Sequence, residues 1–286
     1  MFCYIFLVVE LKIFIVKLYQ IIHLLLFSLN FVKINGVISM HGKIGFFIGC
    51  TVAKMAREIY DSASKVLDSL NIKFEVFGED ICCGMPLILS GYEGEVKPIA
   101  KEVVDRFAKK KVSLIVTSCP ACYRMFSEYY PKILNRNLPF EFYHFTQFVY
   151  KIAKKRELNL KITPTMRVTY HDPCELGRYR QIYEEPRALL NMIQSLNLIE
   201  LKLNRENSTC CGGGGLLKAT FPQVAVEIAK EKIENEIVPL SVDAIITACP
   251  ACYLNFKDGV RETETGIKVY NIEQILALAL GGDDNE

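Results

Sequence analysis

Ten of the eleven cysteines of this chain fall into two copies of one pattern. In each copy a lone Cys comes first, an adjacent Cys-Cys-Gly follows, and Cys-Pro-Ala-Cys comes last. The first cysteine set is Cys50, Cys82, Cys83, Cys119 and Cys122. The second cysteine set is Cys174, Cys210, Cys211, Cys249 and Cys252. Each set has one thiol more than a tetrahedral zinc ion or an ordinary cubane cluster uses, so the count indicates an unusual iron-sulfur centre.

The spacing within the two copies is nearly the same. The lone Cys and the pair are separated by 31 residues in the first copy and 35 in the second, and the pair and the Cys-Pro-Ala-Cys motif by 35 and 37. The flanking residues repeat as well, with TSCPACY at 117–123 and TACPACY at 247–253. The sequence therefore predicts a tandem duplication.

This double motif resembles the cysteine-rich (CCG) family that includes two kinds of heterodisulfide reductase subunit. The smaller kind consists of the double motif, and the larger kind carries it in its carboxy-terminal half. The same motif is found in iron-sulfur subunits of glycolate and lactate oxidation systems and of thiol:fumarate reductase. The resemblance extends from Gly42 to about Leu280. It implies that each cysteine set holds one noncubane 4Fe-4S cluster, and that such a cluster cleaves a disulfide of the coenzyme M/coenzyme B type.

Short apolar runs alternate with amphipathic stretches along the chain, which predicts an α/β fold. Strands are expected at 43–48, 73–77, 112–116, 140–143, 167–170, 199–203, 244–247 and 268–270. Helices are expected at 53–70, 96–110, 120–130, 146–155, 185–196, 222–237 and 272–280. We therefore predict two similar parallel-sheet, Rossmann-like domains at 40–157 and 167–282, joined by a linker at 158–166 that contains Pro164. All three cysteine segments of each domain would then follow strand ends, where functional groups gather in such sheets.

The first 39 residues differ from the rest of the chain and form an apolar extension. Two apolar runs, Met1 to Val9 and Leu18 to Phe31, are interrupted by charges and are too short to span a bilayer. We expect this segment to lie upstream of the natural protein, with Met40 as its start; the alternative is a marginal membrane anchor. Cys3 lies here and belongs to neither set.

Glycines and helix starts suit negatively charged sulfur. Adjacent cysteines on a regular strand point to opposite faces, so the backbone must leave strand geometry at each pair. Gly84 and Gly212 can adopt positive φ there, and Gly84, Gly212 and Gly213 are candidate cofactor-binding residues because a missing side chain lets the backbone approach a cluster. Each Cys-Pro-Ala-Cys is expected to open a helix, whose first amides can donate to thiolate and sulfide.

One ionisable residue lies close to the second cysteine set. His171 precedes Asp172, Pro173 and Cys174, and it is a candidate catalytic proton donor because a disulfide needs protons to become two thiols. The alternative is a histidine that only caps the strand end. His144, Tyr123 and Tyr253 are weaker candidates, and the two tyrosines are expected to pack behind the cluster helices.

Composition limits the classes of partner. The net charge of +2 and the absence of a basic stripe with interleaved aromatics argue against nucleic acid. A disulfide scaffold of this size would be unusual, so free thiols in the reducing cytoplasm are expected. We predict a small thiol or disulfide substrate. We also predict a separate iron-sulfur or flavin protein as electron donor, because the chain lacks the ferredoxin-like region that precedes the double motif in the larger kind of heterodisulfide reductase subunit.

Three functions remain open from the sequence. The first is a heterodisulfide reductase-like iron-sulfur oxidoreductase with its catalytic cluster in the second set, near His171 and the glycines at 212–215. The second is an electron-transfer component of a lactate, glycolate or fumarate system. The third is a zinc- or cluster-binding scaffold without catalysis. A lone thioredoxin-like dithiol would leave the remaining cysteines of the two sets without a role.

Overall fold

The computed structural model describes residues 31–34, 37–40, 42–156 and 158–281. The chain divides into two compact units, Met1–Lys43 and Ile44–Glu286. In the first unit, β1 (Phe31–Ile34) and β2 (Val37–Met40) form an antiparallel pair. Of the predicted apolar extension, residues 1–30 lie outside the described residues. Within the described ranges no helix combines the length and the apolar character that crossing a bilayer requires.

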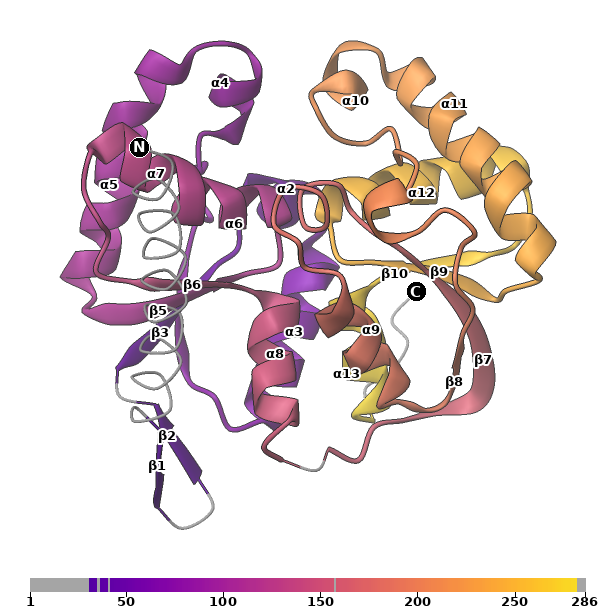
Figure 1. Ribbon diagram of the computed structural model, residues 1–286, viewed down its shortest axis with the longest axis horizontal. Helices are drawn as coiled ribbons and strands as arrows, with labels where there is room; N and C mark the ends of the chain where they lie inside the picture. Colours follow the sequence, from indigo (N-terminus) through magenta and orange to yellow (C-terminus); the bar gives the residue numbers. More distant parts are fainter. Residues whose placement is uncertain (1–30, 35–36, 41, 157, 282–286) are drawn as a thin grey trace, which may run out of the picture. The chain divides into compact units, whose positions relative to one another are not determined.

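The second unit contains two four-stranded parallel sheets (Figure 1). The strands of the first half are β3 (Lys43–Phe47), β4 (Phe74–Phe77), β5 (Val112–Thr117) and β6 (Glu141–His144). Those of the second half are β7 (Lys161–His171), β8 (Gln194–Leu198), β9 (Ala244–Thr247) and β10 (Lys268–Asn271). The sheet orders β4-β3-β5-β6 and β8-β7-β9-β10 are the same topology, which confirms the duplicated α/β fold predicted from the sequence.

Helices connect the strands and cover the sheets. The first half has α2 (Cys50–Met55), α3 (Arg57–Ser69), α4 (Met85–Leu89), α5 (Val96–Lys109), α6 (Pro120–Arg124), α7 (Tyr130–Leu134) and α8 (Phe145–Ala153). The second half has α9 (Glu184–Asn191), α10 (Leu217–Thr220), α11 (Pro222–Lys232), α12 (Pro250–Thr263) and α13 (Ile272–Ala279). Helix α3 packs against α13 and α8 against α9, so the two halves share one interface in Figure 1.

Two predictions about the start of the second half are wrong. The expected linker is mostly strand, because β7 begins at Lys161 and includes Pro164. A proline is tolerated there since the pairing with β8 shifts register between Lys161 and Met166, and pairing with β9 begins only at Val168. The second strand of this half is at 194–198 instead of 199–203. The Asn204 side chain donates to the Leu201 carbonyl at 2.6 Å and closes a turn where the strand was expected.

Other boundaries differ by less. The helix predicted at 53–70 is two helices, because Ala56 leaves helical geometry with φ −147° and ψ 50°. The helix that opens at Pro120 continues through a π-helical turn at Met125–Tyr129 to Leu134. The first half has an aromatic core in which the Phe126 ring lies edge-on to Phe47 and Phe107, with centroid distances of 4.8 and 5.8 Å.

A buried carboxyl lies in the first turn of α13. Neither oxygen of Glu273 has a hydrogen-bond partner among the residues described, although the Ser118 side chain is close enough to favour the ionised form. Burial dominates and raises the pKa of Glu273 from 4.5 to about 8. Above pH 4.5 the unfolded chain loses this proton while the folded chain keeps it, so Glu273 reduces stability as the pH rises towards 8.

The variant Glu273→Gln should therefore stabilise the cluster-free chain at high pH. Glutamine has nearly the shape of the protonated acid and cannot ionise. We expect the free energy of unfolding at pH 8 to rise by about 2–4 kcal/mol, and to be nearly unchanged at pH 4.5. Urea denaturation at the two pH values measures this difference, and an equal effect at both would show that ionisation is not the cause.

Candidate metal centres

All ten cysteines of the two sets follow the carboxyl ends of parallel strands. Cys50 and Cys119 follow β3 and β5, and the pair Cys82-Cys83 lies in the loop after β4. The second set has the same placement after β7, β8 and β9. Because neighbouring parallel strands end at one edge of a sheet, three distant chain segments meet there in each half. None of these ten cysteines forms a disulfide.

The thiols of the first set form a continuous group. The Sγ atoms of Cys50 and Cys82 are 3.6 Å apart. Hydrogen bonds from Cys122 and from Cys82 lower the pKa of the Cys83 thiol to about 6, and a hydrogen bond with Cys119 raises the pKa of Cys122 well above its ordinary value. Neighbouring sulfur atoms thus lead from Cys50 to Cys119, and their mutual hydrogen bonds favour ionisation of Cys83 over Cys122.

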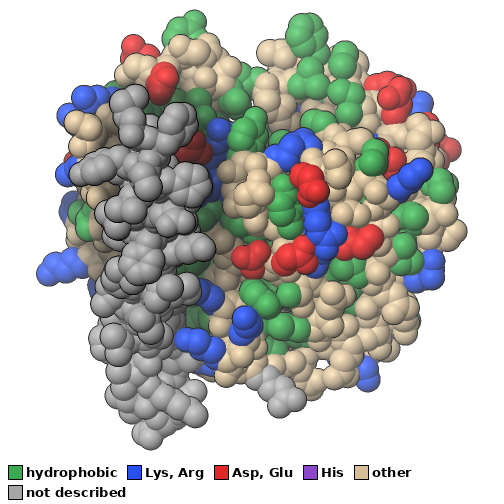
Figure 2. Space-filling model, viewed as in Figure 1, with side chains coloured by type: hydrophobic (Ala, Val, Ile, Leu, Met, Phe, Trp, Pro, Cys, Tyr) green, Lys and Arg blue, Asp and Glu red, His purple; other side chains and the backbone are tan. Residues whose placement is uncertain are grey.

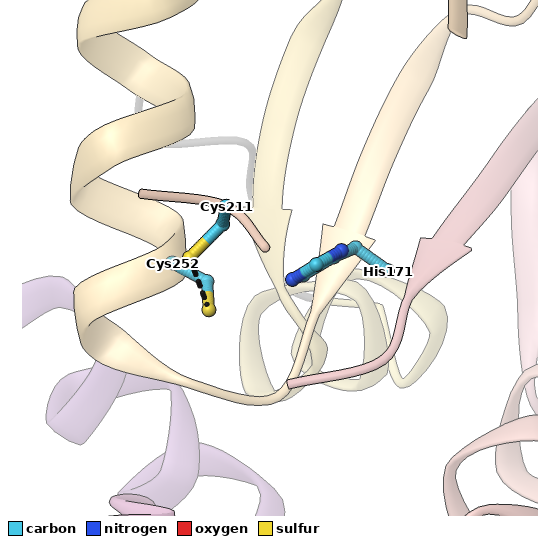
Figure 3. A group of neighbouring side chains, drawn as sticks. All are labelled: His171, Cys211 and Cys252. Atoms are coloured by element: carbon cyan, nitrogen blue, oxygen red, sulfur yellow. Dashed lines mark hydrogen bonds between the residues drawn. The ribbon is translucent and has the colours of Figure 1, made fainter. Parts of the chain in front are cut away.

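The second set is assembled in the same way. The Sγ atoms of Cys211 and Cys252 are 2.9 Å apart (Figure 3). Hydrogen bonds with Cys210 and Cys252 lower the pKa of Cys211 well below its ordinary value, while burial and the charge of Cys249 raise the pKa of Cys174 to about 11. The structure therefore places the five cysteines of each set at one sheet edge, with direct sulfur contacts between Cys50 and Cys82 and between Cys211 and Cys252. Soft metal ions bind such groups.

Backbone amides point at the adjacent pairs. Gly84 N donates to Cys82 Sγ at 3.4 Å, and Gly212 N donates to Cys210 Sγ at 3.3 Å. Gly84 and Gly212 have φ of +89° and +78°, the conformation expected from the sequence. A third amide, that of Gly213, donates to Cys211 Sγ at 3.4 Å. Such donors stabilise thiolate charge, as do the helix starts at Pro120 and Pro250.

The tetraglycine segment of the second half, Gly212 to Gly215, has a tight part and an open part. A Cβ on Gly212 would lie 2.5 Å from the Ala225 carbonyl, and one on Gly213 would lie 2.3 Å from the Ala251 carbonyl. Side chains on Gly214 and Gly215 would meet no atom within 4 Å. The first two glycines thus allow close packing against the protein backbone, and the last two face open space.

The two sites differ in accessibility. Cys210 is exposed, whereas the other nine cysteines of the two sets are buried or half-buried. A short helix follows each adjacent cysteine pair: α4 in the first half and α10 in the second, both at the top of Figure 1. Figure 2 shows hydrophobic side chains at the top of both halves. The exposed large hydrophobic residues in or next to these helices include Leu89, Tyr92, Phe221 and Val224. The second site therefore has the one exposed thiol of the ten, Cys210, although its Cys249 is buried where the equivalent Cys119 is half-buried.

His171 lies beside the second set, as predicted. One of its ring nitrogens and the sulfurs of Cys211 and Cys252 are all within 4.8 Å of one another, and in Figure 3 the ring points towards the two thiols. The imidazole is buried, lies edge-on to Phe256 at 4.9 Å, and its Nδ1 has no partner in the described part of the chain.

The other polar candidates have structural contacts. Asp172 forms a buried bidentate ion pair with Arg187, in which Nη1 and Nη2 each donate to a carboxylate oxygen at 2.7 Å. Its carboxylate therefore already has a partner other than His171. His144 caps α8: its Nδ1 lies 2.8 Å from Thr146 Oγ1, and burial lowers its pKa to about 4. Tyr253 and Tyr123 are buried at the start of the helices that carry Cys252 and Cys122.

Three residues that support the sites were not found from the sequence. Buried Asn255 donates to the carbonyls of Cys211 and Ala225 at 2.6 and 2.7 Å. In the first half the Tyr130 hydroxyl donates to the Cys83 carbonyl at 2.9 Å. Lys232, which is buried, donates to Thr209 Oγ1 at 2.5 Å beside Cys210. A polar residue within an apolar helical stripe, as at Asn255 and Lys232, is the signal that could have indicated them.

Comparison with known proteins identifies the family. The family model described as "Cysteine-rich domain" matches residues 44–127 and again 168–257. The chain therefore belongs to the cysteine-rich domain family and contains two copies of its domain.

Two of the relatives are longer than this chain, and a third is matched over nearly its whole length. The chain is 33% identical over 242 residues to one component of the dihydromethanophenazine:CoB--CoM heterodisulfide reductase of Methanosarcina acetivorans, covering 83% of this chain and 59% of that protein. It is 33% identical to one component of the fumarate reductase (CoM/CoB) of Methanothermobacter marburgensis, covering 84% of this chain and 47% of that protein. Lactate utilization protein A 1 of Bacillus mycoides is 26% identical, with 82% and 96% coverage. The chain thus spans less than two thirds of the two reductase components.

Proposed function

We propose that the chain is an iron-sulfur oxidoreductase subunit in which each cysteine set holds one noncubane 4Fe-4S cluster. The observation that carries this proposal is the convergence of ten free thiols, five at each sheet edge. The donor set is entirely sulfur, and the backbone amides of Gly84, Gly212 and Gly213 donate to three of its thiols, which suits an iron-sulfur cluster. The fifth thiol in each set suits a cluster that binds both members of an adjacent pair.

The proposed reaction is reduction of a disulfide of the coenzyme M/coenzyme B type, the compounds that the names of two relatives mention. Two electrons and two protons convert a disulfide into two thiols. A bound cluster would supply the electrons one at a time. The chain's own residues would hold the cluster, shield it from water and deliver a proton.

The second site fits the catalytic role better than the first. Cys210 is exposed and the open glycines Gly214 and Gly215 leave room for a small molecule near it. His171 is the ionisable side chain beside Cys211, and its unpartnered Nδ1 can exchange a proton. In this proposal His171 is the proton donor, and the first cluster serves as a relay or as a second centre.

A separate electron donor, an iron-sulfur or flavin protein, is part of the proposal. Several relatives are named as subunits of larger reductases, and free thiols on both halves suit a reducing compartment such as the cytoplasm. A second candidate function is electron transfer within a lactate-type system. It is favoured by the lactate utilization relative, which the match covers over 96% of its length. Such an electron-transfer protein would hold clusters and show no disulfide reductase activity by itself.

Metal analysis of the anaerobically purified chain tests the proposal. We expect about eight irons and as many acid-labile sulfides per chain, since each cluster contains four of each. Addition of coenzyme M and coenzyme B thiols should then change the paramagnetic resonance signal. Zinc without sulfide would contradict the cluster assignment and support a scaffold role, and clusters that do not respond to thiols would support electron transfer.

A further inference from the structure

The two cysteine sets are connected across the interface between the halves. In each half, the helix that begins with Cys-Pro-Ala-Cys contacts the segment that carries the lone Cys of the other half. On one side Arg124, two residues after Cys122, reaches Glu175, the residue after Cys174. On the other side the hydroxyl of Tyr253, next to Cys252, donates to Glu58 Oε1 at 2.9 Å. Glu58 lies in α3, which follows the short helix α2 that begins at Cys50.

Arg124 makes the more extensive of these connections. Its Nη1 donates to both carboxylate oxygens of Glu175 at 3.4 and 3.2 Å, and its Nε donates to Glu128 at 3.1 Å. Its Nη2 donates to the Tyr129 hydroxyl at 3.1 Å. The guanidinium also lies 3.7 Å from the ring centre of Tyr179, in the same loop as Cys174. One side chain of the first half therefore contacts the Cys174 loop at two points.

A second arginine strengthens this connection from the opposite direction. Arg180, in the Cys174 loop, lies 3.7 Å from Glu128 and covers the ring of Tyr123 at 5.3 Å. The side chains of Arg124, Glu175 and Glu128 are only 13%, 21% and 26% exposed. Ion pairs at this depth are screened less than surface pairs, and removing one partner leaves charges partly buried without compensation.

We propose that Arg124 is a positioning residue for the second cysteine set: it belongs to the first half and holds the Cys174 loop where the Cys174 thiol can join the other four. The loop from Pro173 to Tyr183 is outside any helix or strand, so its position depends on such contacts. The second site is then complete only when the first half is folded against it. This inference rests on Cys174 being a ligand, but on neither the cluster type nor the disulfide reaction.

The variant Arg124→Met tests this in the cluster-free chain. Methionine keeps apolar bulk and removes both contacts with the loop. We expect iodoacetamide to modify Cys174 about tenfold faster than in the wild type, while Cys82 in the first set keeps its rate. Peptide mass spectrometry measures the modification rate of each cysteine. After anaerobic reconstitution the variant should lose the iron of the second set and retain that of the first.

A double-mutant cycle separates loss of the contact that positions the Cys174 loop from a general destabilisation of the fold. Glu175→Gln should also accelerate modification of Cys174, and adding it to Arg124→Met should give little further increase because both act through one contact. Arg261→Met removes an exposed pair with Asp258 on α12 and is the matched control, expected to leave all rates unchanged.

Two results would overturn the proposal: an unchanged Cys174 rate in Arg124→Met, or equal acceleration at Cys82 and Cys174. If Arg124→Met does not fold, Glu175→Gln decides alone by the same criteria. Because alkylation is measured without clusters or substrate, its outcome is independent of whether the chain reduces disulfides.

Discussion

Replacing Cys211 with serine should remove about half of the iron from the chain, a fall from about eight to about four atoms. Cys211 is buried, lies 2.9 Å from Cys252 Sγ and is hydrogen-bonded to Cys210, so it is central to the second set. A serine hydroxyl is a harder and far less acidic ligand than a thiol, and iron-sulfur clusters depend on soft thiolate. Disulfide reduction should be lost with this cluster.

Iron and sulfide analysis with paramagnetic resonance measures the effect, and the duplication supplies its controls. Cys83→Ser changes the equivalent cysteine of the first set and should remove the other half of the iron. Cys3→Ser alters the cysteine outside both sets and should leave the content unchanged. Full iron in the Cys211→Ser protein would show that the adjacent pair is not a ligand pair.

Replacing His171 with glutamine should lower the rate of disulfide reduction by about 10²–10⁴-fold while the iron content stays the same. Glutamine fills similar space and can still form hydrogen bonds, but it cannot carry a transferable proton near neutral pH. The proposed cluster ligands are the five cysteines of the second set and not His171, so loss of the proton should affect turnover more than cluster binding. Steady-state kinetics on the loaded protein, together with iron analysis, give both readouts.

His144→Asn is the matched control for this variant. His144 is also a buried histidine, but it caps α8, and Asn271 occupies the equivalent capping position before α13. Asparagine is a good helix cap, so turnover should be maintained. If His171→Gln loses iron as well as activity, His171 is part of the metal-binding group or its packing, and the proton-donor role is wrong.

The sequence by itself determined the duplication and the α/β class, and it predicted the membership of each cysteine set. It could do so because these features are local or periodic: strands 112–117 and 244–247 are continuous apolar runs, and Cys-Pro-Ala-Cys signals a helix start through its proline. The positive φ of Gly84 and Gly212 also follows from two adjacent cysteines that must face one site.

The tertiary structure decided features that depend on partners far away in the chain. Pro164 lies in strand β7 because the register shift in its pairing with β8 leaves room for it, which no local pattern shows. Asp172 is bonded to Arg187, 15 positions away in the sequence, and Asn255 and Tyr130 hold the cysteine pairs through backbone carbonyls. The contact between Arg124 and Glu175 joins residues 51 positions apart in different halves. Hydrogen bonds and ion pairs of this kind depend on where the folded backbone places each donor, and spacing along the sequence carries little of that information.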